Sequence, residues 1–172
     1  MPWLEEVLLG GTFDHLHDGH RALLESAISF GKFVRVGVTT DAFARRMRKT
    51  DKYISLLQPL EERKASVRKF LESRGCTNYE ILVINDRYGP ALNSESTEGI
   101  VVTEETYPTA VEINKLRAIK GLDQLLILVI PFVYDEQGLI ISSRRIRKQL
   151  YSQLKKDGKN DANKSLLTFN AF

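Results

Sequence analysis

Short apolar runs alternate along this sequence with longer segments of helical periodicity, and this alternation limits the folds open to it. The runs are rich in Val, Ile and Leu, and turn residues such as glycine and proline separate them from the helical segments. We therefore predict an α/β protein with a doubly wound, mostly parallel five-stranded sheet and helices on both faces. The predicted strands are 4–10, 33–39, 79–84, 100–103 and 124–133, and the predicted helices are 19–30, 59–74, 108–120 and 143–154.

Length and composition fit one globular domain. The chain has 172 residues, of which 42% are hydrophobic and 27% charged. We assign residues 1–154 to this domain and 155–172 to a C-terminal tail, either mobile or docked through its apolar residues Leu166, Leu167, Phe169 and Phe172. The single cysteine excludes an internal disulfide and a multi-cysteine metal site. No apolar run approaches the roughly 20 residues of a membrane span, and the N-terminus lacks signal-peptide features, so we expect a cytoplasmic protein.

Two basic clusters suggest anionic ligands. Residues 41–74 carry ten Lys and Arg against five Asp and Glu, and residues 144–159 carry seven against one. Nucleotides, phosphorylated metabolites and nucleic acids all fit such clusters. Composition alone does not choose among them. Part of the first cluster, residues 41–58, has no clear pattern and is expected to be partly helical.

The segment Gly10–His20 joins the first strand to the first helix, which Asp18 is predicted to cap. Ligands of doubly wound sheets bind beyond the carboxyl ends of the strands, so this turn is a candidate site. Its glycines allow backbone to approach a phosphate closely, and His17 and His20 are spaced to donate to one phosphate. A glycine turn with surface histidines is the plain alternative. A metal site of His15, His17 and His20 would lack an acidic or thiol partner at a familiar spacing.

The segment Ile141–Arg147 places two serines and three arginines at the start of the last predicted helix. Serines at this position cap helices, and arginines on such a helix are commonly solvated. Serine hydroxyls together with free N–H groups and arginine side chains also form a phosphate cradle.

These two segments resemble signatures of a known superfamily. Gly11-Thr12-Phe13-Asp14 followed by His17-Asp18-Gly19-His20 resembles the H-x-G-H signature of the nucleotidyltransferases, and 141–147 resembles their I-S-S-(T/S)-x-I-R motif, with Arg144 where the family has Thr or Ser. The stretches 86–92, 100–106 and 113–117 resemble the archaeal and eukaryotic branch of the phosphopantetheine adenylyltransferases. The similarity covers Leu8 to Arg147, and the chain departs from the branch after that.

The resemblance implies a Rossmann-like nucleotidyltransferase fold and a reaction. ATP and 4′-phosphopantetheine would give dephospho-coenzyme A and pyrophosphate by direct in-line attack on the α-phosphate, with Mg²⁺ carried by the ATP phosphates and no protein metal site. The implied catalytic residues are His20, His17 and Thr12. Those implied for ATP are Gly11, Thr12, Phe13, His17, His20, Glu104, Glu105, Thr106, Asn114, Ser142, Ser143 and Arg147. Those implied for phosphopantetheine are Thr12, Arg45, Arg46, Tyr88, Gly89 and Thr103, and the cation for its phosphate stays open among Arg45, Arg46, Arg48 and Lys49.

Two other functions remain open at this point. A sibling enzyme would transfer a cytidylyl group, or an adenylyl group to nicotinamide or flavin mononucleotide. A non-catalytic module would bind nucleotides or nucleic acid through the basic clusters, but these contain few aromatic residues for stacking on bases, so we do not expect nucleic acid as a partner. We also expect no membrane partner. A homo-oligomer is left open, because bacterial members of the superfamily form hexamers.

Overall fold

Five parallel strands form a single sheet. The computed structural model of the chain describes residues 1–169, with side chains described through Gly158. The strands are β1 (Leu4–Gly11), β2 (Gly31–Thr39), β3 (Tyr79–Ile84), β4 (Gly99–Thr103) and β5 (Leu126–Ile130). Their order is β3-β2-β1-β4-β5 and every pairing is parallel, which confirms the predicted doubly wound sheet. The order reverses between β1 and β4, where such sheets bind their ligands.

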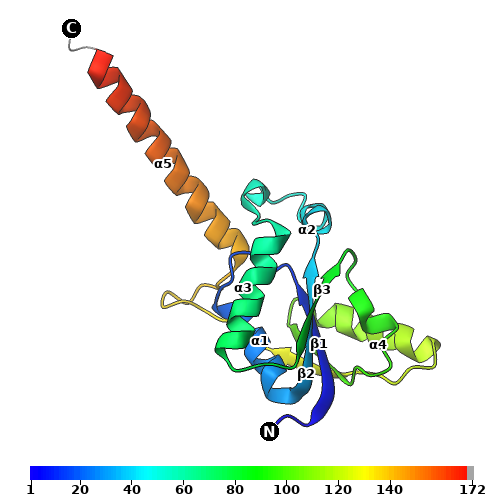
Figure 1. Cartoon of the computed structure of the whole chain (residues 1–172). Helices are drawn as coiled ribbons and strands as arrows, with labels where there is room; N and C mark the ends of the chain where they lie inside the picture. Colours follow the sequence, from blue (N-terminus) through cyan, green and yellow to red (C-terminus); the bar gives the residue numbers. More distant parts are fainter. Residues whose placement is uncertain (170–172) are drawn as a thin grey trace.

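Helices cover both faces of the sheet (Figure 1). Helices α1 (Asp18–Phe30) and α3 (Leu60–Ser73) pack on one face, and α4 (Tyr107–Ile119) packs on the other. The remaining helices are α2 (Asp41–Met47), α5 (Ser143–Phe169) and the short 3₁₀ helices η1 (Ile54–Leu56) and η2 (Gly89–Leu92). The unpatterned segment 41–58 therefore contains α2 and η1, as its partly helical prediction allowed.

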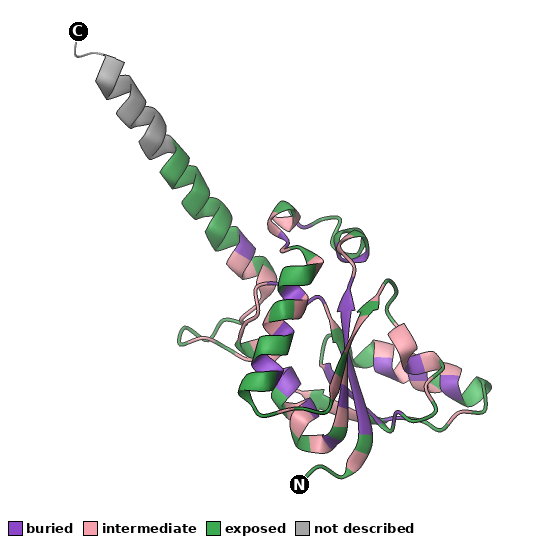
Figure 2. Ribbon diagram, in the orientation of Figure 1, coloured by how far each residue is buried: buried purple, intermediate pink, exposed green. Residues whose placement is uncertain are grey.

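The core has two layers because the central strand contributes to both faces. Along β1, Val7 and Leu9 pack with α1 and α3, whereas Leu8 packs with α4. Buried residues accordingly concentrate in the sheet and the inner sides of the helices (Figure 2). Because side chains alternate across a strand, a strand buried on both faces reads as a continuous apolar run, which is the pattern that located β1.

Strand β5 and helix α5 differ most from their predicted ranges. Strand β5 begins at Leu126 rather than Gln124 and ends at Ile130 rather than Val133, since Pro131 has no N–H to donate to a sheet. Helix α5 does not end near Leu154 but continues to Phe169 and extends away from the sheet (Figure 1). Residues 151–158 of this helix are exposed, and the apolar residues expected to dock the tail lie outside the described side chains. No helix of the described part is long and apolar enough to cross a membrane.

Candidate active site

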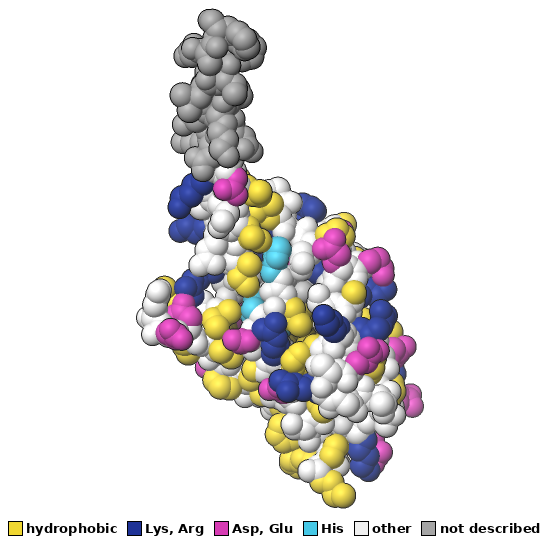
Figure 3. Space-filling model, turned by 60° about the vertical axis from the view of Figure 1, so that its left-hand side comes forward, with side chains coloured by type: hydrophobic (Ala, Val, Ile, Leu, Met, Phe, Trp, Pro, Cys, Tyr) yellow, Lys and Arg dark blue, Asp and Glu magenta, His cyan; other side chains and the backbone are white. Residues whose placement is uncertain are grey.

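Two adjoining cavities open at the carboxyl ends of the strands. The histidine cavity, of about 470 Å³, is lined by the first turn of α1, the first turn of α5 and the segment 131–142. The second cavity, of about 310 Å³, lies between β1, α2, the loop after β3 and α4. We call it the acceptor cavity because Tyr88 and Gly89, which were predicted for the acceptor, line it. The two cavities share Gly10, Gly11, Thr12, Met47, Arg48, Glu105 and Thr106. One face of the molecule, where histidine side chains reach the surface, is shown in Figure 3.

The two histidines of the first motif cap helix α1. The ring Nδ1 of His17, the N-cap residue, accepts the Gly19 N–H at 3.1 Å, and Nδ1 of His20 accepts the His17 N–H at 3.4 Å. Asp18 was predicted as the cap, but it lies inside the helix and pairs with Arg21 at 2.8 Å. Because a backbone N–H only donates, both Nδ1 atoms are acceptors, and each neutral ring carries its proton on Nε2. Both rings line the histidine cavity as neutral hydrogen-bond donors.

The same two rings stack on each other. Their centroids are 3.8 Å apart, and the ring of Phe13 packs against His20 in a tilted arrangement with a centroid distance of 5.3 Å. Burial lowers the pKa of His17 to about 4, with a further contribution from the charge of Arg21. Burial, together with the charges of His17 and Arg48, also holds the pKa of His20 well below its usual value. Both histidines are therefore neutral near pH 7.

The loop after β1 has a strained backbone. Phe13 and His15 have positive φ angles of 52° and 46°, which non-glycine residues rarely adopt. Thr12, between β1 and this pair, is nearly buried, and its hydroxyl accepts a hydrogen bond from Thr39 at 3.2 Å. The hydroxyl proton of Thr12 is therefore not used in this contact and is available to an anion in either cavity.

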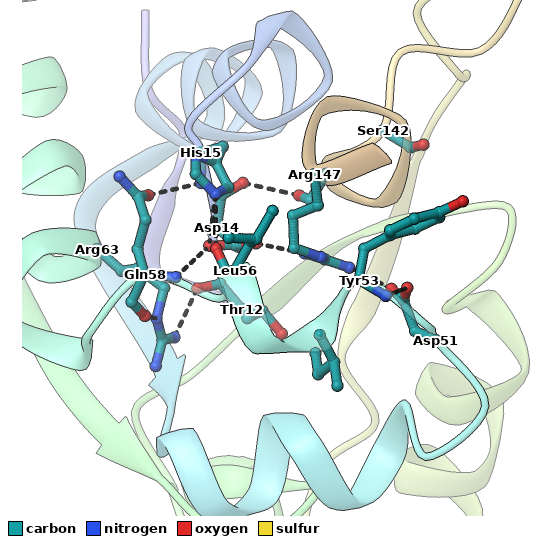
Figure 4. Close-up of polar contacts among 12 residues, drawn as sticks. Thr12, Asp14, His15, Asp51, Tyr53, Leu56, Gln58, Arg63, Ser142 and Arg147 are labelled. Carbon is teal, nitrogen blue, oxygen red and sulfur yellow. Dashed lines mark hydrogen bonds and ion pairs between the residues drawn. The ribbon is translucent and has the colours of Figure 1, made fainter. Parts of the chain in front are cut away.

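A buried polar network holds this loop in place (Figure 4). Arg63 donates to the Thr12 carbonyl at 2.7 Å. The backbone N–H of Gln58 donates to Oδ1 of Asp14, and its side-chain Oε1 accepts the His15 N–H. The fully buried carboxylate of Asp14 pairs with Nη1 of Arg147, which also donates from Nη2 to Asp51 at 2.5 Å. Although burial raises the pKa of Asp51, hydrogen bonds from Arg147 and the Tyr53 N–H hold it below its usual value. The strained loop is thus fixed by side chains from α3, α5 and the segment 51–58.

The second motif meets the first through its serines. The Ser143 hydroxyl donates to the Asp14 carbonyl at 2.7 Å, and Ser142 caps the start of α5 by accepting the Arg145 N–H at 3.4 Å. Both serines and Arg144 line the histidine cavity. Arg147 was predicted to hold a leaving pyrophosphate. It lines the histidine cavity, but its terminal nitrogens are bonded to Asp14 and Asp51, so it anchors the loop.

Of the four basic residues left open after β2, Arg48 is the one that lines both cavities. Arg45 and Arg46, predicted for the acceptor, line neither: they donate to the carbonyls of Ile54 and Asn85 at 3.2 and 3.4 Å. The guanidinium of Arg48 is accessible from the cavities, and desolvation together with the nearby charge of Arg147 holds its pKa below the usual value. Of the four candidates for the predicted cation, Arg48 therefore has the position that fits, and the predicted Arg45 and Arg46 lie away from both cavities.

The loop after β3 forms a wall of the acceptor cavity. Asp86 accepts the N–H groups of Tyr88 and Gly89 at 2.8 and 2.7 Å, and Gly89 has the positive φ of 52° that this tight turn requires. Both residues, which were predicted to border the pantetheine arm, line this cavity. The buried Arg117, which sequence reasoning did not assign, donates to the carbonyls of Ala91 and Ser94 and so fixes the loop. In the sequence, the signal for this role was a basic residue on the inner face of the predicted helix 108–120.

Other residues predicted for ligands lie in different surroundings. Glu105 and Thr106 line both cavities, but Thr103, expected at the acceptor, lines the histidine cavity instead. Glu104 is exposed and lines neither cavity. The amide of Asn114 is used within the fold, because it donates to the Leu125 carbonyl at 2.9 Å and accepts the Leu125 N–H at 2.8 Å. Asn114, predicted to contact the nucleotide, lines neither cavity.

At the switch point of the parallel sheet, the strained loop after β1 meets the starts of two helices, one capped by histidines and the other by a serine. This arrangement defines a nucleotidyltransferase type of site. The chain belongs to the cytidylyltransferase-like family, whose model matches residues 8–149.

Relatives within this family carry a more particular name. The chain is 45% identical over 146 residues to a phosphopantetheine adenylyltransferase of Methanopyrus kandleri, covering 84% of this chain and 90% of that protein. It is 43% identical over 145 residues to a protein of the same name from Thermococcus kodakarensis, covering 84% and 86%. A solved structure of an Archaeoglobus fulgidus protein of unknown function has a TM-score of 0.64 at 32% identity, covering 73% of this chain and 88% of that one.

Proposed function

We propose that this protein transfers the adenylyl group of ATP to 4′-phosphopantetheine, giving dephospho-coenzyme A and pyrophosphate. The single observation that carries the proposal is the meeting of the two cavities at Thr12 and Arg48, directly beside the histidine pair. A phosphate at the end of an elongated acceptor fits there against the α-phosphate of a nucleotide. The names of the archaeal relatives support this choice of acceptor.

In this proposal the histidine cavity holds the nucleotide phosphates. The Nε2–H groups of His17 and His20 donate to the α-phosphate oxygens, where charge grows in the transition state. The Ser142 hydroxyl and the free N–H groups at the start of α5 receive the leaving phosphates, close to the Arg144 guanidinium, whereas the Ser143 hydroxyl is already bonded to the Asp14 carbonyl. Neutral donors suit this task because they are already oriented by the cap of α1 and need no proton exchange.

The acceptor cavity holds the other substrate. Its lining is largely apolar, from β1, β4 and α4, and suits an uncharged arm that ends in a phosphate. Thr12 and Arg48 orient that phosphate. One of its oxygens forms a bond to the α-phosphorus while the bond from that phosphorus to the bridging oxygen breaks, and pyrophosphate takes the electron pair. The nucleophile is already an anion, so no general base is required.

We further propose that Mg²⁺ enters on the nucleotide phosphates. Among the described residues, no three His, Cys, Asp or Glu side chains are grouped as a metal site. Of the two carboxylates that line the histidine cavity, Asp51 is engaged by Arg147 and Glu105 belongs to no such group, so the cavity fits a protein-bound metal poorly. No step above depends on the metal.

A substrate panel tests the proposed reaction. The protein is incubated with Mg²⁺, ATP or CTP, and 4′-phosphopantetheine, nicotinamide mononucleotide, flavin mononucleotide or a cytidylyl acceptor, and pyrophosphate release is followed with product identification by mass. Dephospho-coenzyme A formed from ATP and 4′-phosphopantetheine alone supports the proposal. Turnover of another acceptor assigns a sibling activity to the same site, and ATP binding without any turnover contradicts an enzymatic function.

A further inference from the structure

A short hairpin forms one wall of the histidine cavity. Residues 133–141 fold back on themselves through an isolated bridge between Tyr134 and Ile140 and a hydrogen bond from the Ile141 N–H to the Val133 carbonyl. The two legs meet the cavity through Val133, Ile140 and Ile141. The bridge consists of that hydrogen bond and one from the Asp135 N–H to the Leu139 carbonyl, which is little for such a hairpin, since isolated hairpins are marginal in water. Other contacts must keep this wall in place.

Arg145 supplies those contacts from the first turns of α5. Its Nη2 donates to Oδ2 of Asp135 at 2.5 Å, and its Nη1 donates to the carbonyls of Ile140 and Leu139 at 3.1 and 3.4 Å. The other oxygen of Asp135 accepts the N–H groups of Gln137 and Leu139, both at 2.9 Å. One guanidinium thus joins the carboxylate at the turn of the hairpin to the backbone of its returning leg.

The two neighbouring arginines lie on different sides of the helix. Arg144 lines the histidine cavity, whereas Arg145 does not line it and contacts the hairpin. Successive residues of a helix are separated by about 100°, so one faces the ligand site while the next faces the element beside it. Of this pair, Arg144 is therefore placed for a ligand and Arg145 for the wall of the cavity.

We propose that Arg145 is a positioning residue for the nucleotide: it holds the hairpin 133–141 against α5 so that the wall exists before the nucleotide binds. This rests on the proposed function in that a nucleotide occupies the histidine cavity. Pre-ordering a loop removes part of the entropy cost of binding, so the effect falls on affinity. The chemical step is not affected, because Arg145 lies outside the cavity that holds the reacting groups.

The test compares Arg145→Met with Arg145→Lys and with Lys148→Met, an exposed control on the same helix. For each variant we would measure the dissociation constant of ATP by calorimetry without acceptor, kcat and the KM for ATP, and the rate of cleavage after the exposed Glu136 by a Glu-specific protease. We expect Arg145→Met to weaken ATP binding about tenfold, with kcat within about twofold and faster cleavage at Glu136. Arg145→Lys should recover part of the ATP affinity and part of the resistance to cleavage at Glu136. Lys148→Met should resemble the wild type.

The outcomes separate this inference from the proposed function. ATP affinity and Glu136 cleavage that match those of Lys148→Met would overturn the positioning role, as would a fall in kcat at unchanged ATP affinity. Failure of the wild type to make dephospho-coenzyme A would overturn the proposed function and not this inference, since ATP affinity and cleavage at Glu136 are measured without the acceptor.

Discussion

Arg147 and Asp51 are 96 residues apart in the sequence, yet Nη2 of the arginine donates to Oδ2 of the aspartate at 2.5 Å, with side chains only 1% and 6% exposed. The same guanidinium pairs with Asp14 in the strained loop. Arg147 therefore connects three parts of the site: the loop after β1, the first turns of α5, and the segment that follows Arg48. A buried arginine with two carboxylate partners fixes their relative positions.

Asp51→Asn tests this connection. The amide keeps the shape of the carboxylate but removes its charge, so Arg147 loses a charged partner while remaining buried. We expect the free energy of unfolding to fall by about 1.5–3 kcal/mol, measured by urea denaturation followed by circular dichroism. The exposed Asp157→Asn on α5 is the control and should change stability little. Equal stabilities of the two variants would contradict an anchoring role for Asp51.

The two ring nitrogens of His20 have separate tasks, and two substitutions separate them. In His20→Asn the amide oxygen lies near the Nδ1 position and preserves the cap, but the Nε2 donor is lost. We expect little loss of thermal stability and a fall in kcat of about 100- to 1000-fold. His20→Gln places an amide N–H near the Nε2 position and should retain more activity. A large fall in melting temperature for His20→Asn, with equal activity losses in both variants, would instead indicate a structural histidine.

Gly19 leaves room for the ring of His17. A Cβ at residue 19 would lie 3.0 Å from Cε1 and 3.1 Å from Nδ1 of that ring, so the ring must move. Because alanine favours helices over glycine, we expect Gly19→Ala to keep or slightly raise the melting temperature while kcat falls about tenfold. Gly158→Ala, where a Cβ meets nothing within 4 Å, is the matched control. A loss of thermal stability together with the loss of activity would show that the His17 ring cannot move to accommodate the added Cβ.

The strands and the turn after β1 were predictable because their signals are local. Apolar runs, helix-starting prolines and glycine turns determine these elements within a few residues of chain. The extension of α5 was not predictable in this way, because residues 155–165 are polar apart from Ala162 and Gly158 and resemble a solvated tail in the sequence. A helix without core contacts gives little periodic signal.

Residues of the site were predicted where the motif is contiguous and missed where the fold brings distant segments together. The positions of His17 and His20 followed from their spacing at a helix start. Nothing near Arg147 in the sequence indicates Asp51, and nothing distinguishes Arg48 from Arg45 or Arg46 within one basic cluster. Their roles depend on which way each side chain points at the end of a two-turn helix.

The low pKa values of the two histidines predict a dependence of stability on pH. Histidines of the unfolded chain bind protons near pH 6.5, whereas His17 in the folded protein does so only near pH 4, so acidification between these values favours the unfolded state. The melting temperature should therefore fall as the pH drops from about 6.5 towards 4. In NMR spectra, the Cε1–H signals of His17 and His20, assigned with Gln variants, should not shift between about pH 5.5 and 8. A titration near pH 6.5 for either ring would contradict the neutral-donor assignment.

The position of Arg48 between the two cavities predicts a selective effect on the acceptor. Arg48→Ala removes a cation that contacts both cavities without disturbing a hydrogen bond of the described fold. A charge-assisted contact to phosphate contributes about 1.5–3 kcal/mol, so we expect kcat/KM for 4′-phosphopantetheine to fall at least about tenfold. Arg46→Ala, in the same cluster but directed at the Asn85 carbonyl, is the control and should change it less than about threefold. If Arg46→Ala shows the larger loss, the acceptor phosphate lies on the far side of α2. The placement of Thr12 at the reacting phosphate would then fail as well, because that residue lines the same junction as Arg48.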